Sequence, residues 1–296
     1  MDFELPDLKI LRRCWPDYED PATTRTVNVN GQEFGGQRPV VIAGPCAVES
    51  YEQTLEIAQA VKEAGATLLR GGAFKPRTSP HDFQGLGVEG LEILAAVRRE
   101  TGLGFVTEAM DPRMVETVAE VADMIQVGSR SLHNVPLLTE VGMTRMPVML
   151  KRGWSATLAE WLCAAEYIAH EGNREIVFCE RGIRSSCHWS YARNVLDLNV
   201  IEPLRRSTPL PVIVDPSHAT GQWKLVAAMS HAAIAAGAHG LLIEAVGPMT
   251  EREMLKCDAE QGIPPHVLEE ITAAACMAEI TPVGHLDRST SPAGCD

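Results

Sequence analysis

Residues 67–107 read TLLRGGAFKPRTSPHDFQGLGVEGLEILAAVRRETGLGFVT. The short apolar run Thr67–Leu69 predicts a buried strand, and a polar, glycine-rich loop follows it at residues 70–87. A segment with helical periodicity then leads to a second apolar run, Gly104–Thr107. Strand, loop, helix and strand in this order are typical of parallel strands joined by crossover helices.

The same unit recurs along most of the chain. Strands are predicted at Val40–Ala43, Thr67–Leu69, Gly104–Thr107, Met124–Val127, Pro147–Leu150, Glu175–Phe178, Val212–Val214 and Gly240–Ile243. Ser50 is expected to cap a helix that ends at Gly65, and Thr157 to begin one that ends at Gly172. Eight units whose strands are apolar on both faces predict a (β/α)8 barrel, in preference to an open doubly wound sheet.

Two segments depart from this rhythm. An Asn30-Gly31 turn between alternating residues predicts a β-hairpin ahead of the barrel. Residues 185–194 show no helical pattern, so the helix after the sixth strand is not expected before Asn194. The predicted organisation is an N-terminal extension with the hairpin (1–38), a catalytic barrel (39–280) and a flexible tail (281–296).

Composition limits the choice of partners. The chain has 296 residues, 45% of them hydrophobic, which is enough to bury a large core. Its formal net charge of -13 argues against nucleic acid or an acidic membrane surface as a partner. Eight cysteines without a CxxC pair, and an N-terminus without an apolar signal region, indicate a protein of the reducing cytoplasm.

The loop at 70–87 has a composition suited to phosphate. Arg70, Lys75 and Arg77 supply cations, and Thr78 and Ser79 supply hydroxyl groups. Arginine meets phosphate oxygens two at a time, and glycine lets backbone N–H groups approach closely. The alternative is a solvated basic loop.

Chemically capable residues also follow the other predicted strands, where active sites of such barrels lie. One subset combines a thiol, an imidazole and two carboxyl groups, which suits a divalent cation such as Mn, Fe, Co or Zn. These candidate metal ligands are Cys46, His218, Glu244 and Asp258. Each of them alone could instead be an ordinary buried residue.

The second subset is cationic. It carries more positive charge than one phosphate needs, which predicts two phosphorylated ligands, or one phosphate and a carboxylate. Its members are Arg77, Arg130, Lys151, Arg152, Arg181 and Arg184. Surface salt bridges could instead account for Arg152 or Arg184.

Several long motifs stand in order at these strand ends, and together they carry a family resemblance. The motifs are GPCAVES (44–50), RGGAFKPRTSPHDFQGLG (70–87), TEAMD (107–111), LKRG (150–153), CERGIR (179–184) and VDPSHATG (214–221). They resemble the 3-deoxy-D-arabino-heptulosonate 7-phosphate (DAHP) synthases, in the compact branch related to 3-deoxy-D-manno-octulosonate 8-phosphate synthase. The resemblance implies a metal-dependent condensation of phosphoenolpyruvate with erythrose 4-phosphate, the first step of the shikimate pathway, in a homodimer or homotetramer.

The resemblance also implies roles for single residues. It assigns Cys46, His218, Glu244 and Asp258 to the metal, and Arg130, Lys151 and Arg181 to phosphoenolpyruvate. The segment from Lys75 to Ser79 would reach both substrates, with Arg77 and Thr78 on the aldose phosphate. Lys151 is the expected general acid, while Glu108 and Asp215 are expected to move protons, to orient other groups or to be structural.

Two segments differ from the family pattern. After Glu244 the family usually has Val-His-Pro, whereas this chain has Ala245-Val246-Gly247-Pro248, and its last acid lies about three residues later than expected. Glu260 is therefore an alternative to Asp258. The loop at 185–191 is longer than the family's link and carries Cys187, His188 and Trp189.

These differences leave the aldehyde acceptor open. The alternatives are a paralogue of specialised metabolism that accepts another aldose phosphate, such as an amino or imino analogue, and a barrel that only binds phosphometabolites. A metal-dependent aldolase or hydrolase on the same barrel is a further alternative. Few residues flank the barrel, so no regulatory domain is expected in this chain.

Overall fold

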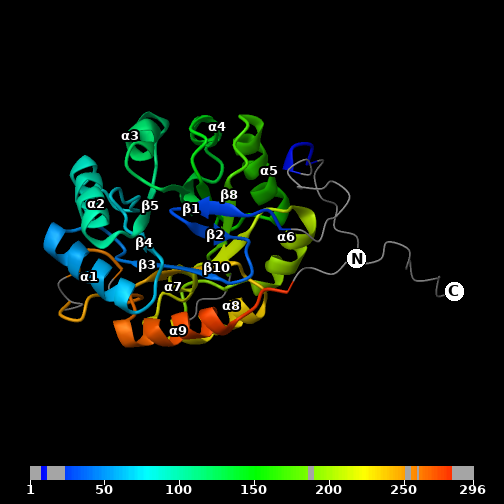
Figure 1. Ribbon diagram of the computed structural model, residues 1–296. Coiled ribbons are helices and arrows are strands. Elements are labelled where there is room, and N and C mark those ends of the chain that lie inside the picture. The colour runs from blue at the N-terminus through cyan, green and yellow to red at the C-terminus, as the bar shows by residue number, and fades with distance from the viewer. Residues whose placement is uncertain (1–7, 12–23, 186–189, 251–254, 259, 282–296) are drawn as a thin grey trace.

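The structure is a computed structural model that describes residues 8–11, 24–185, 190–250, 255–258 and 260–281. A closed barrel of eight strands forms its centre, with helices around the outside (Figure 1). The barrel strands are β3 (Val40–Gly44), β4 (Leu68–Arg70), β5 (Gly104–Glu108), β6 (Met124–Val127), β7 (Val148–Lys151), β8 (Ile176–Glu180), β9 (Val212–Val214) and β10 (Gly240–Glu244). The larger helices are α1 (Tyr51–Glu63), α2 (Val88–Thr101), α4 (Val135–Met143), α5 (Leu158–His170), α6 (Ile201–Ser207), α8 (Trp223–Ala235) and α9 (Pro265–Met277).

The barrel prediction is confirmed. Every neighbouring pair of strands is parallel, and β10 pairs with both β3 and β9, which closes the ring. Each predicted strand lies within two residues of an observed one. The strands could be recognised in the sequence because a strand that is buried on both faces is a continuous apolar run, without alternating polar residues.

Along each strand, successive side chains point alternately into the barrel and toward the outer helices. The core therefore has two layers, one inside the barrel and one between the strands and the helices. Ile42 and Leu68 point into the barrel with Met124, whereas their neighbours Val41 and Leu69 pack between the strands and the outer helices. Successive side chains of a strand point to opposite faces, so one strand serves both layers. Burying each of these large aliphatic side chains contributes about 1.5–3 kcal/mol.

A hairpin closes one end of the barrel, as predicted. Strands β1 (Val27–Val29) and β2 (Gln32–Phe34) pair antiparallel, and they cross in front of the barrel strands in Figure 1. Val27, Val29 and Phe34 are fully buried in the layer inside the barrel, while Glu33 faces solvent. The hairpin lies at the amino ends of the strands, since the Asn30 side chain leaves no room for a Cβ at Gly104, the first residue of β5.

The helix ends follow the predicted signals. The Ser50 hydroxyl accepts a hydrogen bond from the Gln53 N–H at the start of α1. Thr157 and Glu160 form a reciprocal capping box at the start of α5. Gly65 and Gly172 both have φ near +90°, the left-handed conformation that ends a helix with little strain for glycine.

Two helical segments are short or late. The helix after β5 is a 3-10 turn (Pro112–Met114) followed by α3 (Val115–Ala119). No helix is expected before Asn194, and the described residues agree, because a 3-10 turn (Leu198–Val200) leads into α6, which begins at residue 201. Val195 pairs with Ile183, and the Asn194 N–H donates to the Ala219 carbonyl.

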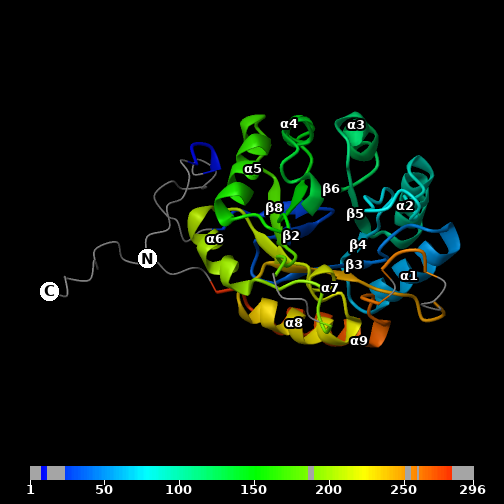
Figure 2. The same ribbon diagram turned by 180° about the vertical axis from the view of Figure 1, so that it is seen from behind.

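The predicted division of the chain at residues 38 and 280 stays a prediction. Of the tail predicted at 281–296, only Thr281 lies within the described residues. Residues Cys187, His188 and Trp189 of the unusual loop also lie outside them. The loops at the other end of the barrel from the hairpin are exposed to view in Figure 2.

Candidate active site

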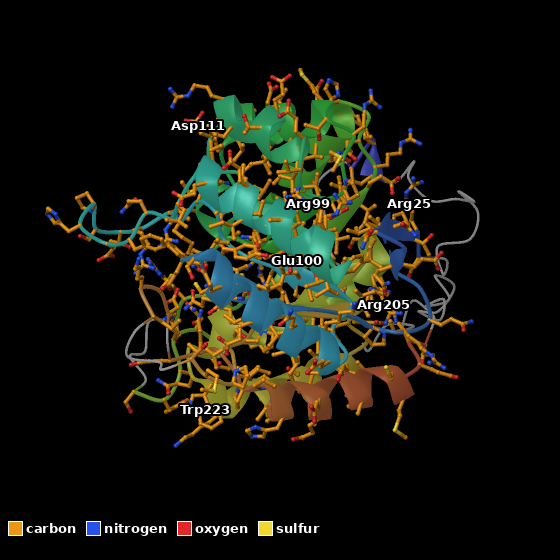
Figure 3. The ribbon with its side chains drawn as sticks, turned by 60° about the vertical axis from the view of Figure 1, so that its left-hand side comes forward. Arg25, Arg99, Glu100, Asp111, Arg205 and Trp223 are labelled. Carbon is orange, nitrogen blue, oxygen red and sulfur yellow. The ribbon has the colours of Figure 1, made fainter. Side chains whose placement is uncertain are left out.

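The carboxyl ends of the strands surround a cavity of about 590 Å³. Its walls come mainly from the loop after β4 and from the ends of β5, β6, β7 and β8. Figure 3 shows the barrel from the side, with the loop after β4 projecting on the left and Arg25, next to the hairpin, on the right. The cavity therefore opens on the side of the barrel away from the hairpin.

Most of the predicted substrate-binding residues line this cavity. They are Arg70, Lys75, Arg77, Thr78, Arg130, Lys151, Arg181 and Arg184. Arg130 and Arg184 both stack on the indole of Trp154, at 4.7 and 4.2 Å from the ring centre to the guanidinium carbon. This contact holds two flexible cations at the cavity wall. Ser79 does not line the cavity; its hydroxyl accepts a hydrogen bond from the His81 N–H.

Arg152 has a different environment from the one predicted. Its guanidinium lies 3.1 Å from a Glu180 oxygen and 2.8 Å from an Asp197 oxygen, and it does not line the cavity. The side chain also donates to the Ala156 carbonyl. Arg152 is outside the cavity lining, and these contacts favour the salt-bridge alternative; its role in substrate binding stays a prediction.

A chain of charged groups crosses the floor of the cavity. Lys151 Nζ lies 2.6 Å from Asp215 Oδ2, and the same oxygen lies 2.7 Å from His218 Nδ1. Burial alone would raise the pKa of Asp215, but the neighbouring His218 and Lys151 outweigh it and hold the pKa well below its ordinary value. Asp215 therefore stays ionised and orients both neighbours.

Glu108 lies apart from this chain, on the cavity wall. Its carboxylate accepts a hydrogen bond of 3.0 Å from Gln126 Nε2. Burial raises the pKa of Glu108, although Lys75 and Lys151 act in the opposite direction. A buried carboxyl group with a raised pKa is suited to exchanging protons near neutral pH.

The four predicted metal ligands converge at the edge of the cavity. The donor atoms of Cys46, His218 and Glu244 all lie within 4.8 Å of one another, and Asp258 Oδ2 lies 3.4 Å from Cys46 Sγ. The alternative ligand Glu260 is in neither of the candidate metal-binding groups found among the described residues. Burial lowers the pKa of His218 to about 4, which keeps the imidazole neutral. Neutral imidazole is the form that binds a metal, and Asp215 orients it through Nδ1.

The donor set fits a divalent cation. Thiol, imidazole and carboxylate donors together match the borderline metals Mn, Fe, Co and Zn. Glu244 is 1% exposed, and one of its oxygens faces both Arg70, at 2.9 Å, and His218 Nε2, at 3.2 Å. Such a concentration of buried donors is unusual for a group of purely structural residues.

Three further residues take part in the site without having been predicted. Cys257 Sγ lies 3.1 Å from Cys46 Sγ. Arg193 lies 3.1 Å from Asp258 Oδ1 and lines the cavity with Trp154. For Cys257, the only sequence signal was its position next to Asp258.

A closed parallel barrel with a cationic cavity and a cluster of metal-binding residues at the carboxyl ends of its strands defines a (β/α)8 enzyme class that acts on phosphorylated anions. The comparison with known proteins agrees with this class. The model of the DAHP synthetase I family matches residues 23–281, and the chain belongs to that family. No helix among the described residues is long and apolar enough to cross a membrane.

Two kinds of relative are similar to this chain. The "phospho-2-dehydro-3-deoxyheptonate aldolase" of Thermotoga maritima is 43% identical over 245 residues, which cover 83% of this chain and 71% of that protein. The "2-dehydro-3-deoxyphosphooctonate aldolase" of Syntrophobacter fumaroxidans is 32% identical and covers 82% and 87%. The crystal structure of the Thermotoga maritima enzyme, described as a DAHP synthase, superposes with a TM-score of 0.83 at 39% identity, over 92% of this chain and 77% of that one.

Proposed function

We propose that this chain condenses phosphoenolpyruvate with erythrose 4-phosphate to give 3-deoxy-D-arabino-heptulosonate 7-phosphate and inorganic phosphate. One observation carries the proposal. Lys151 faces the cationic cavity and is linked through Asp215 to His218 of the metal-binding cluster. A phosphorylated anion in the cavity would therefore lie beside the candidate metal site.

The cavity residues account for binding and orientation. Arg130, Arg181 and Lys151 would hold the phosphate and carboxylate of phosphoenolpyruvate, and Arg77 and Thr78 would hold the phosphate of the aldose. Fixing two anions in one cavity replaces a bimolecular encounter with a positioned pair, which lowers the entropic part of the barrier. Cys46, His218, Glu244 and Asp258 would hold the divalent cation, which supplies Lewis-acid polarisation of the aldehyde oxygen.

The reaction consumes one water, forms one carbon–carbon bond, and replaces the C2–oxygen bond to phosphate with a C2–oxygen bond to the oxygen of that water. The electron pair of the C2–C3 double bond attacks the aldehyde carbon, and the aldehyde oxygen takes up a proton. Water adds at C2, and the resulting tetrahedral intermediate expels inorganic phosphate as the C2 ketone forms. Lys151 is placed to donate the proton to the developing alkoxide, a role that contributes about 10²–10⁴-fold to rate. Glu108, with its raised pKa, is the candidate to accept the proton from water.

Phosphate release tests the proposal directly. Purified protein is incubated with both substrates and Mn²⁺, and then with excess EDTA. Metal-dependent release of phosphate together with a seven-carbon ketose acid product is expected. His218→Ala should abolish release, whereas His231→Ala, on α8 and outside the cavity lining, should not. Absence of phosphate release with Mn²⁺, Fe²⁺, Co²⁺ and Zn²⁺ alike would reject the proposal.

A different acceptor is the second candidate. The relatives named as octonate aldolases have an eight-carbon product, which leaves a five-carbon aldose once the three carbons of phosphoenolpyruvate are subtracted. Ser185 and Asp258, which are described residues of the two segments that differ from the family pattern, both line the cavity. Turnover of four-carbon and five-carbon aldose phosphates, and of amino analogues, under equal conditions would identify the preferred acceptor. Assembly as a homodimer or homotetramer stays a proposal for size measurement in solution.

A further inference from the structure

We propose that Cys257 is an additional ligand of the divalent cation, so that the site holds the ion with two thiolates. This inference rests on the cation site of the proposed function and deepens it, because a second thiolate changes which metals the site prefers. Thiolate ligands favour Zn²⁺, Co²⁺ and Fe²⁺ over Mn²⁺, which prefers oxygen donors.

The position of the Cys257 sulfur carries the first part of the argument. It lies 3.1 Å from Cys46 Sγ and 3.5 Å from Asp258 Oδ2, and the three donor atoms form one candidate metal-binding group. Two thiolates on one five-coordinate cation are about 3.3–4.0 Å apart, given metal–sulfur distances of about 2.3 Å and angles of about 90–120°. The sulfurs therefore need to separate by only about 0.2–0.9 Å, a shift within reach of small χ1 rotations.

The charges around the cluster carry the second part. Each anionic donor has one cation in contact with it: Lys75 with Cys46 at 3.0 Å, Arg70 with Glu244 at 2.9 Å, Arg193 with Asp258 at 3.1 Å and Arg77 with Cys257 at 2.8 Å. Cys257 thus has the same electrostatic environment as the three anionic ligands already assigned.

The backbone carries the third part. Asp258 has φ of +44°, in the left-handed region that residues other than glycine adopt rarely, with aspartate among the less rare cases, at a cost of up to about 1–2 kcal/mol. In this conformation the side chains of Cys257 and Asp258, adjacent in sequence, both approach the Cys46 sulfur. Unfavourable backbone geometry of this kind persists where the surrounding structure requires it, most often at functional sites.

Ordinary packing does not explain this position. Cys257 is 4% exposed and belongs to a small buried cluster with Cys46 and Ala47. A cysteine that only fills space would have its sulfur against carbon atoms. Here the sulfur faces a thiol, a carboxylate and a guanidinium.

Cobalt provides a readout that is independent of catalysis. The near-ultraviolet charge-transfer band from sulfur to Co²⁺ grows with the number of bound thiolates. The full chain is loaded with Co²⁺ alone, under a phosphine reductant and with the free thiols counted, so that a Cys46–Cys257 disulfide is excluded. Cys257→Ser and Cys46→Ser are each expected to lose about half of the band per bound cobalt, and the double variant all of it.

A matched control and a second measurement complete the design. Cys276→Ser, at an exposed cysteine of α9, should leave the band unchanged. In competition between Zn²⁺ and Mn²⁺, Cys257→Ser should lower the preference for zinc by about tenfold or more, since even groups that only orient a ligand change metal affinity by this amount.

The outcomes separate this inference from the proposed function. If wild-type protein binds cobalt and Cys257→Ser has the same band and the same zinc preference, Cys257 is not a ligand, while the proposed reaction stands. If reduced wild-type protein binds no cobalt, both the second thiolate and the metal site of the proposed function are rejected.

Discussion

Lys151 and Arg152 are neighbours at the end of β7, but their side chains meet different groups. Lys151 faces the cavity and Asp215, whereas Arg152 points toward Glu180 and Asp197. Alternation along a strand explains the difference, because adjacent side chains leave it on opposite faces. Two cations next to each other in sequence therefore have separable roles.

Substituting each of them by methionine should separate these roles. Lys151→Met is expected to lower kcat by about 10²–10⁴-fold, because the proton donor is lost. Arg152→Met is expected to keep kcat within a few-fold but to lower the free energy of unfolding by about 3–5 kcal/mol, because the buried Glu180 carboxylate and the partly exposed Asp197 carboxylate lose their cation. Initial rates and urea unfolding measure the two effects, with Lys224→Met on the exposed side of α8 as control. A collapse of kcat in folded Arg152→Met would restore substrate binding as its role.

Glu108 gives the protein a predictable pH dependence of stability. Its folded pKa is raised by burial, so the protonated form is favoured by folding. The stability contributed by this group is fully present below the unfolded pKa of about 4.3 and is lost as pH rises through the folded pKa. Glutamine cannot ionise, so Glu108→Gln removes this loss.

The expected result is a larger gain in Tm for Glu108→Gln over wild type at pH 8 than at pH 4. The quantity compared is the Tm of Glu108→Gln minus the Tm of wild type at each pH. Groups that titrate in both proteins affect both Tm values and cancel to first order. Melting curves of the two proteins at pH 4 and pH 8 measure this difference. An equal difference at both pH values, or a larger gain at pH 4, would contradict the burial argument.

The hairpin acts as a single element that fills the amino end of the barrel. Phe34 is fully buried there, and its neighbour Glu33 is exposed on the opposite face. Phe34→Ala is expected to lower the free energy of unfolding by about 3–5 kcal/mol, and Tm by about 6–15 °C. Glu33→Ala, one residue away, should change Tm by less than about 2 °C. If both variants melt like wild type, the hairpin does not support the barrel.

The elements predicted best are those whose signal is local. Each barrel strand is a run that is apolar on both faces, and Ser50, Thr157 and Gly65 mark helix ends through contacts within a few residues. The exact start of α6 has no local signal, because residues 194 and 195 bond to backbone groups near residues 219 and 183.

In the candidate site, too, the residues that could be predicted are those with a local signal in the sequence. Cations and metal-binding residue types at strand ends could be read from the sequence, because the barrel brings all strand ends together. Cys257 was missed because its meaning depends on Cys46, which is 211 residues away. The sequence leaves open whether Arg152 binds substrate or forms salt bridges, because an arginine beside a lysine has the same composition whether it faces the cavity or the helices.

At the scale of the molecule, a cationic cavity lies in an acidic protein. The formal net charge is -13, while eight Arg and Lys side chains among the described residues line the cavity: Arg70, Lys75, Arg77, Arg130, Lys151, Arg181, Arg184 and Arg193. Fields of this kind concentrate anionic ligands at the entrance and weaken as salt shortens the Debye length.

The apparent KM for phosphoenolpyruvate should therefore rise severalfold as sodium chloride increases from about 0.05 to 0.5 M, with little change in kcat, because the Debye length falls from above 10 Å to below 5 Å. Sucrose at matched osmolarity serves as the control for effects unrelated to charge. Steady-state kinetics at each concentration measure it. A KM that does not change with salt would show that binding depends on short-range contacts alone.

Closure of one end of the barrel by the hairpin also bears on the order in which ligands bind and leave. The hairpin fills the amino end of the barrel, so we expect ligands to enter and leave the cavity at the carboxyl ends of the strands. If the two proposed substrates bind one above the other there, the deeper one binds first and leaves last. Initial-rate and product-inhibition patterns measure this order, and random-order kinetics would contradict it.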